Sequence, residues 1–305
     1  MSGSLLVLVP LGLLAIVCLF SFVGCVLETG GLPGDPTITP VANYADIVKA
    51  TPGIVAFWPL NETSGTTALS AEPGFNGTYT TAAPVLACDT VHKSAPASGQ
   101  FTLGQPGLVL GDCINNDPTM VNPCAHFDGG YVEVTWQAAL NPPAPFTIEA
   151  WMKPEWTSQD VMACAAIRIV VGNNDNISGY ALFATDDNYW AAGIGSGTAF
   201  VTARAPAGSN QTIMMGTTDY LAATFDGSTL ILYVNGQEQA RTANIVGFKQ
   251  LPNTVSLIIG CGQNAAHQPV NPVKGRIQDV AFYNVALGAD TISTRFINGN
   301  ACKLT

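Results

Sequence analysis

Short apolar runs separated by Gly, Asn, Asp and Pro fill this 305-residue chain from about residue 50 onward. Residues 131–134 (YVEV) and 146–152 (FTIEAWM) alternate between two faces, so that every second side chain points the same way. A period of two, combined with β-branched and aromatic residues, is typical of β-strands. Both segments are therefore predicted to be strands with one face toward a core.

The strongest local pattern lies between residues 220 and 241. Apolar runs at 220–225 and 229–234 are followed by Asp226-Gly227 and Asn235-Gly236, and a third, mostly polar segment follows at 237–241. Asp-Gly and Asn-Gly accept the positive φ angles that tight hairpin turns require. This segment predicts a three-stranded antiparallel meander.

Further strands are expected at residues 54–60, 255–259 and 275–283, and only residues 287–296 suggest a short helix. The chain shows no internal repeat, is only 10% charged, and contains 31 Gly and 20 Pro. Many short strands with frequent turns and no alternating helices predict an all-β protein, an antiparallel β-sandwich or barrel.

The N-terminal part differs from the rest. Residues 5–27 are almost wholly apolar, and 23 residues are enough to span a bilayer as a helix. Phe22-Val-Gly-Cys25 resembles a bacterial lipobox, in which Cys25 would be lipidated, while the alternative is an uncleaved anchor. No basic residue precedes Lys49, although export signals normally start with one.

This pattern divides the chain into three parts. We expect residues 1–27 to be a signal, lipoprotein signal or membrane anchor in the form of an apolar helix, residues 28–50 a Pro/Gly-rich linker, and residues 51–303 the folded domain. The protein is then exported to the cell surface or the extracellular space and is tethered to the membrane.

The cysteine content and the net charge limit which disulfides, metal sites and partners are expected. The expected domain has six disulfide candidates, which allow 15 pairings, and Cys113–Cys124 is the preferred single guess. The candidates are Cys88, Cys113, Cys124, Cys164, Cys261 and Cys302. The chain has no CxxC spacing, so no zinc site is expected. A formal charge of −10 without a cluster of basic residues excludes nucleic acid as a partner.

Five segments, taken in order, resemble the laminin-G-like domains of the concanavalin A-like lectin/glucanase superfamily. They are residues 55–67, 127–134, 146–154, 223–236 and 274–287. The resemblance implies a jelly roll of two curved antiparallel sheets packed face to face.

Some members of this family bind calcium at the rim of the sandwich, through carboxylates and carbonyls. Ser70 and Gln278 stand where members commonly have aspartate, and the acids that remain as calcium candidates are Glu62, Asp128 and Asp279. Calcium is the only cofactor that the resemblance suggests.

The glucanases of the superfamily resemble one another in a Glu-x-Asp-x-x-Glu strand, which this chain lacks, and the chain has no Gly-x-Ser-x-Gly elbow. We therefore expect no enzyme activity. Four aromatic residues beside turns could stack on sugar rings, although packing at the edge of the sandwich is the alternative for each. They are Trp136, Trp156, Tyr189 and Trp190.

The resulting expectation is a surface-tethered, non-catalytic adhesion or binding module, whose partner is a glycan or a surface protein. The alternative is a structural subunit of a surface layer, filament or phage-like appendage, which would form a homo-oligomer or a larger assembly. A glycoside hydrolase is the least favoured reading.

Overall fold

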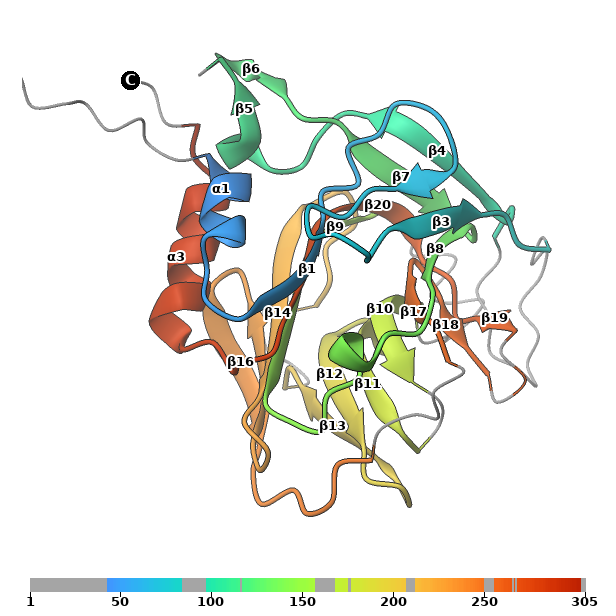
Figure 1. The fold of residues 1–305 in the computed structure, drawn as a ribbon, viewed down its shortest axis with the longest axis vertical. Helices are drawn as coiled ribbons and strands as arrows, with labels where there is room; N and C mark the ends of the chain where they lie inside the picture. The colour runs from blue at the N-terminus through green and yellow to red at the C-terminus, as the bar shows by residue number, and fades with distance from the viewer. Residues whose placement is uncertain are drawn as a thin grey trace, which may run out of the picture. The chain divides into compact units, whose positions relative to one another are not determined.

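The computed structural model describes residues 43–83, 97–115, 117–156, 168–174, 177–206, 212–249, 255–264, 266 and 268–302. The described strands form two eight-stranded antiparallel sheets, which pack as a sandwich (Figure 1). The prediction of an all-β antiparallel sandwich is confirmed.

Sheet A has the strand order β16-β15-β14-β9-β20-β7-β4, and β1 pairs with β20 beside this path. Its strands are β1 (Ile54–Trp58), β4 (Gln100–Gln105), β7 (Cys124–Asp128), β9 (Phe146–Pro154), β14 (Asp219–Phe225), β15 (Leu230–Val234), β16 (Gln237–Thr242) and β20 (Lys274–Tyr283).

Sheet B has the order β13-β12-β11-β10-β17-β8-β3-β2. Its strands are β2 (Thr67–Ala68), β3 (Gly77–Thr80), β8 (Tyr131–Val134), β10 (Arg168–Asn174), β11 (Gly179–Ala184), β12 (Trp190–Gly195), β13 (Phe200–Arg204) and β17 (Leu257–Ile259).

The smaller elements are two hairpins, two 3-10 turns and two helices. They are β5 (Cys113–Ile114) with β6 (Asp117–Val121), β18 (Gly262–Gln263) with β19 (Pro269–Val270), η1 (Leu110–Asp112), η2 (Ala138–Leu140), α1 (Tyr44–Lys49) and α3 (Ala289–Gly299).

The predicted meander is confirmed as β14, β15 and β16, which are neighbours in sheet A. Asn235 and Gly236 have φ angles of 52° and 75°, the positive values for which this dipeptide is suited. The turn before β15 is different, because the Asp226 carboxylate accepts hydrogen bonds from the backbone N–H groups of Ser228 and Thr229. Side-chain capping by aspartate fixes that turn.

The main core lies between the sheets. Alternate residues of β9, beginning with Phe146 and Ile148, face alternate residues of sheet B such as Val132 and Val134. All four side chains are buried, as the alternating pattern predicts.

A second apolar layer covers the other face of β9. Trp151 is 1% exposed and contacts the rings of Tyr44 in α1, Tyr220 in β14 and Phe296 in α3, at centroid distances of 5.9, 5.1 and 6.1 Å. The two helices lie side by side against this face of sheet A (Figure 1). Gly299 leaves the room that the indole needs, since a Cβ there would come within 2.1 Å of Trp151.

The two helices of this second layer can be compared with the elements expected from the sequence. The short helix expected at 287–296 is present as α3, displaced by two to three residues. Residues 44–49, expected in the linker, instead form α1, whose Tyr44 and Val48 are buried and whose Asn43 caps the first turn. The apolar residues 5–27, with Cys25, lie outside the described residues. Among the residues described, no helix has the length and apolarity needed to cross a membrane.

A buried ionic network lies in the second layer. Glu149 is fully buried, and its carboxylate accepts hydrogen bonds from the hydroxyls of Tyr220 (2.6 Å) and Tyr283 (2.7 Å). Arg295 from α3 is 1% exposed, and its Nε lies 3.6 Å from the same carboxylate. The network joins helix α3 to the middle of sheet A.

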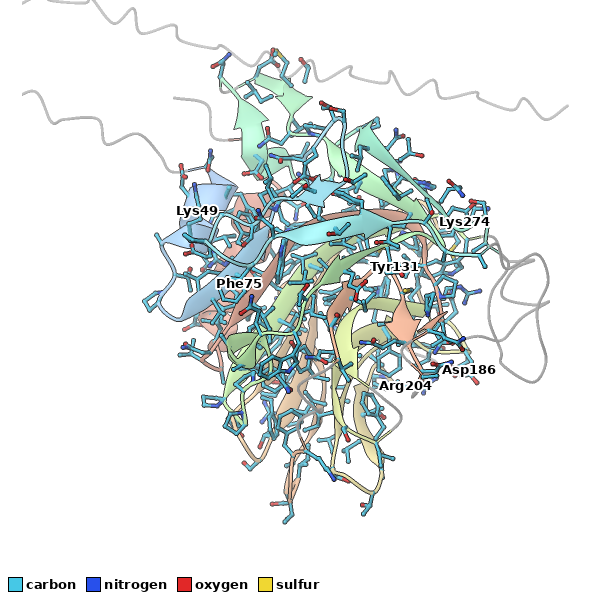
Figure 2. All side chains as sticks on the ribbon, turned by 45° about the vertical axis from the view of Figure 1, so that its right-hand side comes forward. Lys49, Phe75, Tyr131, Asp186, Arg204 and Lys274 are labelled. Atoms are coloured by element: carbon cyan, nitrogen blue, oxygen red, sulfur yellow. A yellow bond between two sulfur atoms is a disulfide. The ribbon has the colours of Figure 1, made fainter. Side chains whose placement is uncertain are left out.

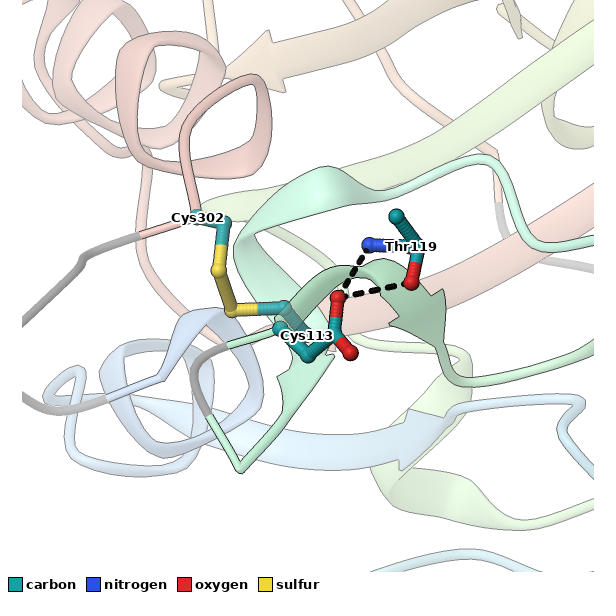
Figure 3. Close-up of a disulfide and its surroundings, with 4 residues drawn as sticks. Cys113, Thr119 and Cys302 are labelled. Carbon is teal, nitrogen blue, oxygen red and sulfur yellow. Dashed lines mark hydrogen bonds between the residues drawn. A yellow bond between two sulfur atoms is a disulfide. The ribbon is translucent and has the colours of Figure 1, made fainter.

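The disulfide prediction is corrected. Cys113 in β5 is bonded to Cys302, just beyond α3, across a sequence separation of 189 residues (Figure 3). Cys124 is a buried free thiol that lies 3.1 Å from the Pro106 carbonyl, so the local Cys113–Cys124 pair does not form. Cys261 is also a buried free thiol, and Cys88 and Cys164 lie outside the described residues.

Candidate functional site

Three of the four predicted binding aromatics gather at one end of the sandwich. The rings of Trp156 and Trp190 meet edge to face, with centroids 6.2 Å apart. Tyr189, beside Trp190, carries the Arg204 guanidinium 4.7 Å from its ring centroid. Figure 2 shows Arg204 near Asp186, which lies in the turn between β11 and β12, and Arg204 forms an ion pair with the next residue, Asp187. Trp136 is half-buried just after β8.

The role expected for the two tryptophans is corrected. Trp156 and Trp190 are only 1% and 2% exposed, too buried to stack on a sugar. A buried indole needs a partner for its N–H. Trp156 donates to Asn188 Oδ1 at 3.1 Å, and Trp190 donates to Asp219 Oδ2 at 2.8 Å. Both rings therefore hold neighbouring polar side chains, Asn188 and Asp219, in place.

In front of Trp190 lies a concavity with a volume of about 220 Å³, which we call the rim pocket. It is formed where the start of β12, the loop before β14 and the β15–β16 turn meet. Its lining residues are Trp190, Thr212, Ile213, Met214, Thr217, Asp219, Val234 and Asn235.

Asp219 is the charged group of the rim pocket. Its side chain is 8% exposed, and each oxygen accepts one hydrogen bond, from Trp190 Nε1 and from Asn235 Nδ2, both at 2.8 Å. Burial raises the pKa of Asp219, while these two hydrogen bonds act in the opposite direction. An ionised carboxylate has about four acceptor positions. The fixed carboxylate thus retains acceptor capacity beyond its two partners.

The loop that carries Ile213 and Met214 is held in place by hydrogen bonds. Ile213 exchanges two hydrogen bonds of 3.0 Å with Asn188, through the backbone N–H of Ile213 to the Asn188 carbonyl and through Asn188 Nδ2 to the Ile213 carbonyl. The Gly216 N–H donates to the Pro154 carbonyl at 2.7 Å. Met214 projects from this loop with 67% exposure. A site with a fixed frame loses little conformational entropy on binding.

Sequence reasoning did not find the polar members of the site. In the sequence Asn235 is identifiable only as a turn residue, and Asp219 and Asn188 belong to no motif. The signal that could have found two of them is positional: Asp219 opens β14 and Asn235 directly follows β15, so an antiparallel hairpin places them at the same end of the sheet.

The three acids named as calcium candidates are not brought together as one group in the described part of the chain. Glu62 accepts hydrogen bonds from the Leu69 backbone N–H at 2.7 Å and from the Tyr79 hydroxyl at 2.8 Å. Asp128 ends β7, where it pairs with Lys274 across the sheet. No group of three His, Cys, Asp or Glu side chains that could hold a metal occurs in the part of the chain that the structure describes.

Asp279 lies in a different environment from the other two acids. It is fully buried, has a φ of 52°, and lies beside Asp112, whose Oδ1 accepts a hydrogen bond from the Ala45 N–H at 2.9 Å. Burial and the neighbouring Asp112 carboxyl raise the pKa of Asp279 well above its usual range. The preceding Gln278, where an aspartate was expected, binds the Leu108 N–H at 2.6 Å and is a structural contact.

The fold and the sequence now identify the family. The family model for concanavalin A-like lectin/glucanases, Laminin_G_3, matches residues 128–293, more than half of the chain. The chain belongs to the concanavalin A-like lectin/glucanase superfamily. No curated protein sequence matches it as a relative.

Solved structures with the same fold include glycan-binding and glycan-cleaving proteins. Domain 4 of AbnA, an extracellular arabinanase of Geobacillus stearothermophilus, was solved with arabinotriose; it is 16% identical, with a TM-score of 0.53, and the match covers 79% of this chain and 97% of that domain. A sialidase of Trypanosoma rangeli, in complex with the inhibitor DANA, is 11% identical, with a TM-score of 0.50. That match covers 81% of this chain and 33% of the sialidase. At these identities the likeness concerns the fold.

Proposed function

We propose that this superfamily member is a non-catalytic carbohydrate-binding module, and that the rim pocket holds one sugar unit. The observation that carries the proposal is the Asp219 carboxylate, fixed by Trp190 and Asn235 inside a concavity of about 220 Å³. Pockets that bind small ligands combine apolar walls with a few fixed polar groups. Sugar hydroxyls donate hydrogen bonds, which suits a carboxylate that keeps acceptor capacity.

The charge of the pocket favours a neutral sugar. Asp219 is the only ionisable side chain among its lining residues, and none of them is Lys, Arg or His. A sialic acid or uronic acid carboxylate would meet a like charge in a partly buried site, which costs affinity. The ligand class is therefore a neutral mono- or oligosaccharide unit.

The presence of a single carboxylate in the rim pocket also argues against catalysis at this site. Glycoside hydrolysis normally needs two carboxyl groups placed across the scissile bond. The rim pocket has one, and its hydrogen bonds to Trp190 and Asn235 suit a fixed acceptor. Domain 4 of AbnA, similar in fold, was solved with an oligosaccharide, which makes arabino-oligosaccharides the first ligands to try.

We further propose that the protein is exported and tethered by its N-terminal segment. The Cys113–Cys302 disulfide supports an oxidising compartment, and the apolar residues 5–27 supply an export signal or anchor. Mass spectrometry of the protein isolated from its own cells tests this. A soluble protein that retains residues 1–27 would contradict it.

Affinity measurements with neutral and acidic oligosaccharides test the binding proposal. We expect the protein to bind neutral probes, beginning with arabinotriose, and to bind sialyllactose and galacturonate oligomers less well. Asp219→Asn should weaken binding about tenfold or more, because a charged hydrogen bond contributes about 1.5–3 kcal/mol. Asp290→Asn, at the exposed start of α3, is the matched control and should bind as the wild type does.

Thr217→Trp gives a second test of the same pocket. Thr217 lines the rim pocket but is exposed, so a tryptophan there should fill the concavity without disturbing the core. Unchanged affinity in both pocket variants would refute the rim pocket as the sugar site. Failure of the wild type to bind any neutral glycan in a broad panel would refute the function.

A further inference from the structure

A second concavity lies on the outer face of sheet B, and we call it the face hollow. Its lining residues are Tyr131, Glu133, Ser256, Ile258, Cys261, Gly262, Gln263 and Pro269. None of these lines the rim pocket. Val132 and Val134 point into the main core, so Tyr131 and Glu133, which alternate with them in β8, point away from it.

The floor and one wall of the face hollow are closely packed. Ile258 of β17 lies opposite Glu133 of β8, and Ile258 and Cys261 are 4% and 1% exposed. The other wall is the β18–β19 hairpin, where a Cβ on Gly262 would come within 2.4 Å of Ile169. The hollow therefore has a firm, largely apolar base. Its volume of about 50 Å³ is room for a few water molecules and too little to enclose a sugar.

The upper edge of the hollow is polar and accessible. Tyr131, labelled in Figure 2, is half-buried, while Glu133 and Ser256 form a hydrogen-bonded pair, with Ser256 Oγ donating to Glu133 Oε1 at 2.8 Å. Gln263 is fixed because its Nε2 donates to the Ser256 carbonyl at 2.6 Å. A half-buried aromatic side chain beside fixed acceptors can take the C–H face of a sugar ring while the sugar hydroxyls are hydrogen-bonded.

We propose that the face hollow is a second glycan contact, which takes an internal unit of a neutral polysaccharide lying across sheet B. Tyr131 stacks on the sugar ring and Glu133 accepts from its hydroxyls. This inference rests on the proposed carbohydrate binding but not on the rim pocket being its site. Because the hollow is too small to enclose a sugar, the chain lies side-on, whereas the larger rim pocket takes a single unit.

The two contacts predict different dependence on ligand length. A hexasaccharide can cover the face hollow and the sheet surface next to it, and a long chain that reaches both contacts would gain affinity by avidity. Stacking on one aromatic ring gives about a tenfold effect when that ring is removed. Tyr131→Phe keeps the ring and is the matched control for Tyr131→Ala.

Calorimetric titrations of the full chain with neutral arabinose, xylose and glucose hexasaccharides test the proposal. We expect Tyr131→Ala to weaken hexasaccharide binding about tenfold and Tyr131→Phe to weaken it less. Binding should also perturb the tyrosine absorption band in the wild type and not in Tyr131→Ala. Thermal unfolding of each variant verifies that it is folded.

The outcomes separate the two proposals. If Asp219→Asn abolishes binding and Tyr131→Ala binds as the wild type does, the face hollow is refuted and the rim pocket stands. If Tyr131→Ala abolishes binding and Asp219→Asn does not, the rim pocket is refuted and the face hollow stands. If the wild type binds neither these hexasaccharides nor any neutral glycan in the broad panel, both are overturned.

Discussion

The buried network at Glu149 makes the sharpest prediction about what holds helix α3 to the sandwich. Glu149→Gln keeps the size of the side chain and removes its charge. One tyrosine hydroxyl, of Tyr220 or Tyr283, then faces an amide N–H in place of a carboxylate oxygen. Arg295, 1% exposed, loses the carboxylate that lies 3.6 Å from its Nε.

Breaking a buried pair by removing one partner costs about 3–5 kcal/mol, because the remaining charge is left uncompensated. We expect Glu149→Gln to lower the free energy of unfolding by that amount in urea titrations followed by tryptophan fluorescence. Adding Arg295→Met should recover part of the loss, because it removes the unpaired guanidinium. Glu133→Gln, at an exposed position, is the control and should change the free energy by less than about 0.5 kcal/mol.

A loss of less than about 1 kcal/mol in Glu149→Gln would refute this reasoning. It would mean that water or another group satisfies Arg295 in the folded protein. No recovery in the double variant would equally show that the charge pair is not what stabilises this layer.

Two further predictions concern the same side of the molecule. Serine at Cys113 or at Cys302 should each lower the free energy of unfolding by about 2–4 kcal/mol, and the double variant should lose no more than either single variant; additive losses in urea titrations would contradict the bond between them. Because burial raises the pKa values of Asp112 and Asp279 above that of an unfolded aspartate, about 3.9, the folded protein binds more protons at those sites. Their stabilising contribution is complete below about pH 4 and is lost as the pH rises through the raised pKa values. Asp279→Asn should therefore gain stability relative to the wild type toward neutral pH, and parallel profiles of unfolding free energy against pH would contradict this.

The sequence predicted the sandwich because local signals agree with the fold. The Asn235-Gly236 turn fixes the register of β15 and β16, and alternation in β9 identifies the residues that face the main core. These features depend on a few neighbouring residues, which is why they can be read without a structure.

The second layer could not be predicted in the same way. Trp151 and Glu149 stand on the face of β9 that alternation would assign to solvent, yet α1 and α3 cover it. Helix α1 has six residues and no clear amphipathic pattern, so its packing depends on long-range contacts. The Cys113–Cys302 bond belongs to the same layer, and its partners are too far apart in sequence for spacing to reveal.

The candidate site could be predicted from the sequence only in small part. Of the four aromatic residues named from the sequence, Trp190 lines the rim pocket and Trp156 packs against Trp190. Their degree of burial depends on the loop that carries Ile213, which the sequence does not place. Asp219 can be identified as a site residue only from the structure, which brings its two hydrogen-bond donors, Trp190 and Asn235, together.

The central claim is that a neutral sugar binds against Asp219 in the rim pocket. The most direct test follows the indole N–H signals in an ¹⁵N-labelled protein by NMR during titration with a neutral oligosaccharide that it binds, starting with arabinotriose. Since Trp190 Nε1–H donates to Asp219 at 2.8 Å, its signal should shift progressively with ligand and should stay still in Thr217→Trp. Saturable binding that leaves the Trp190 signal unmoved in the wild type would contradict the claim.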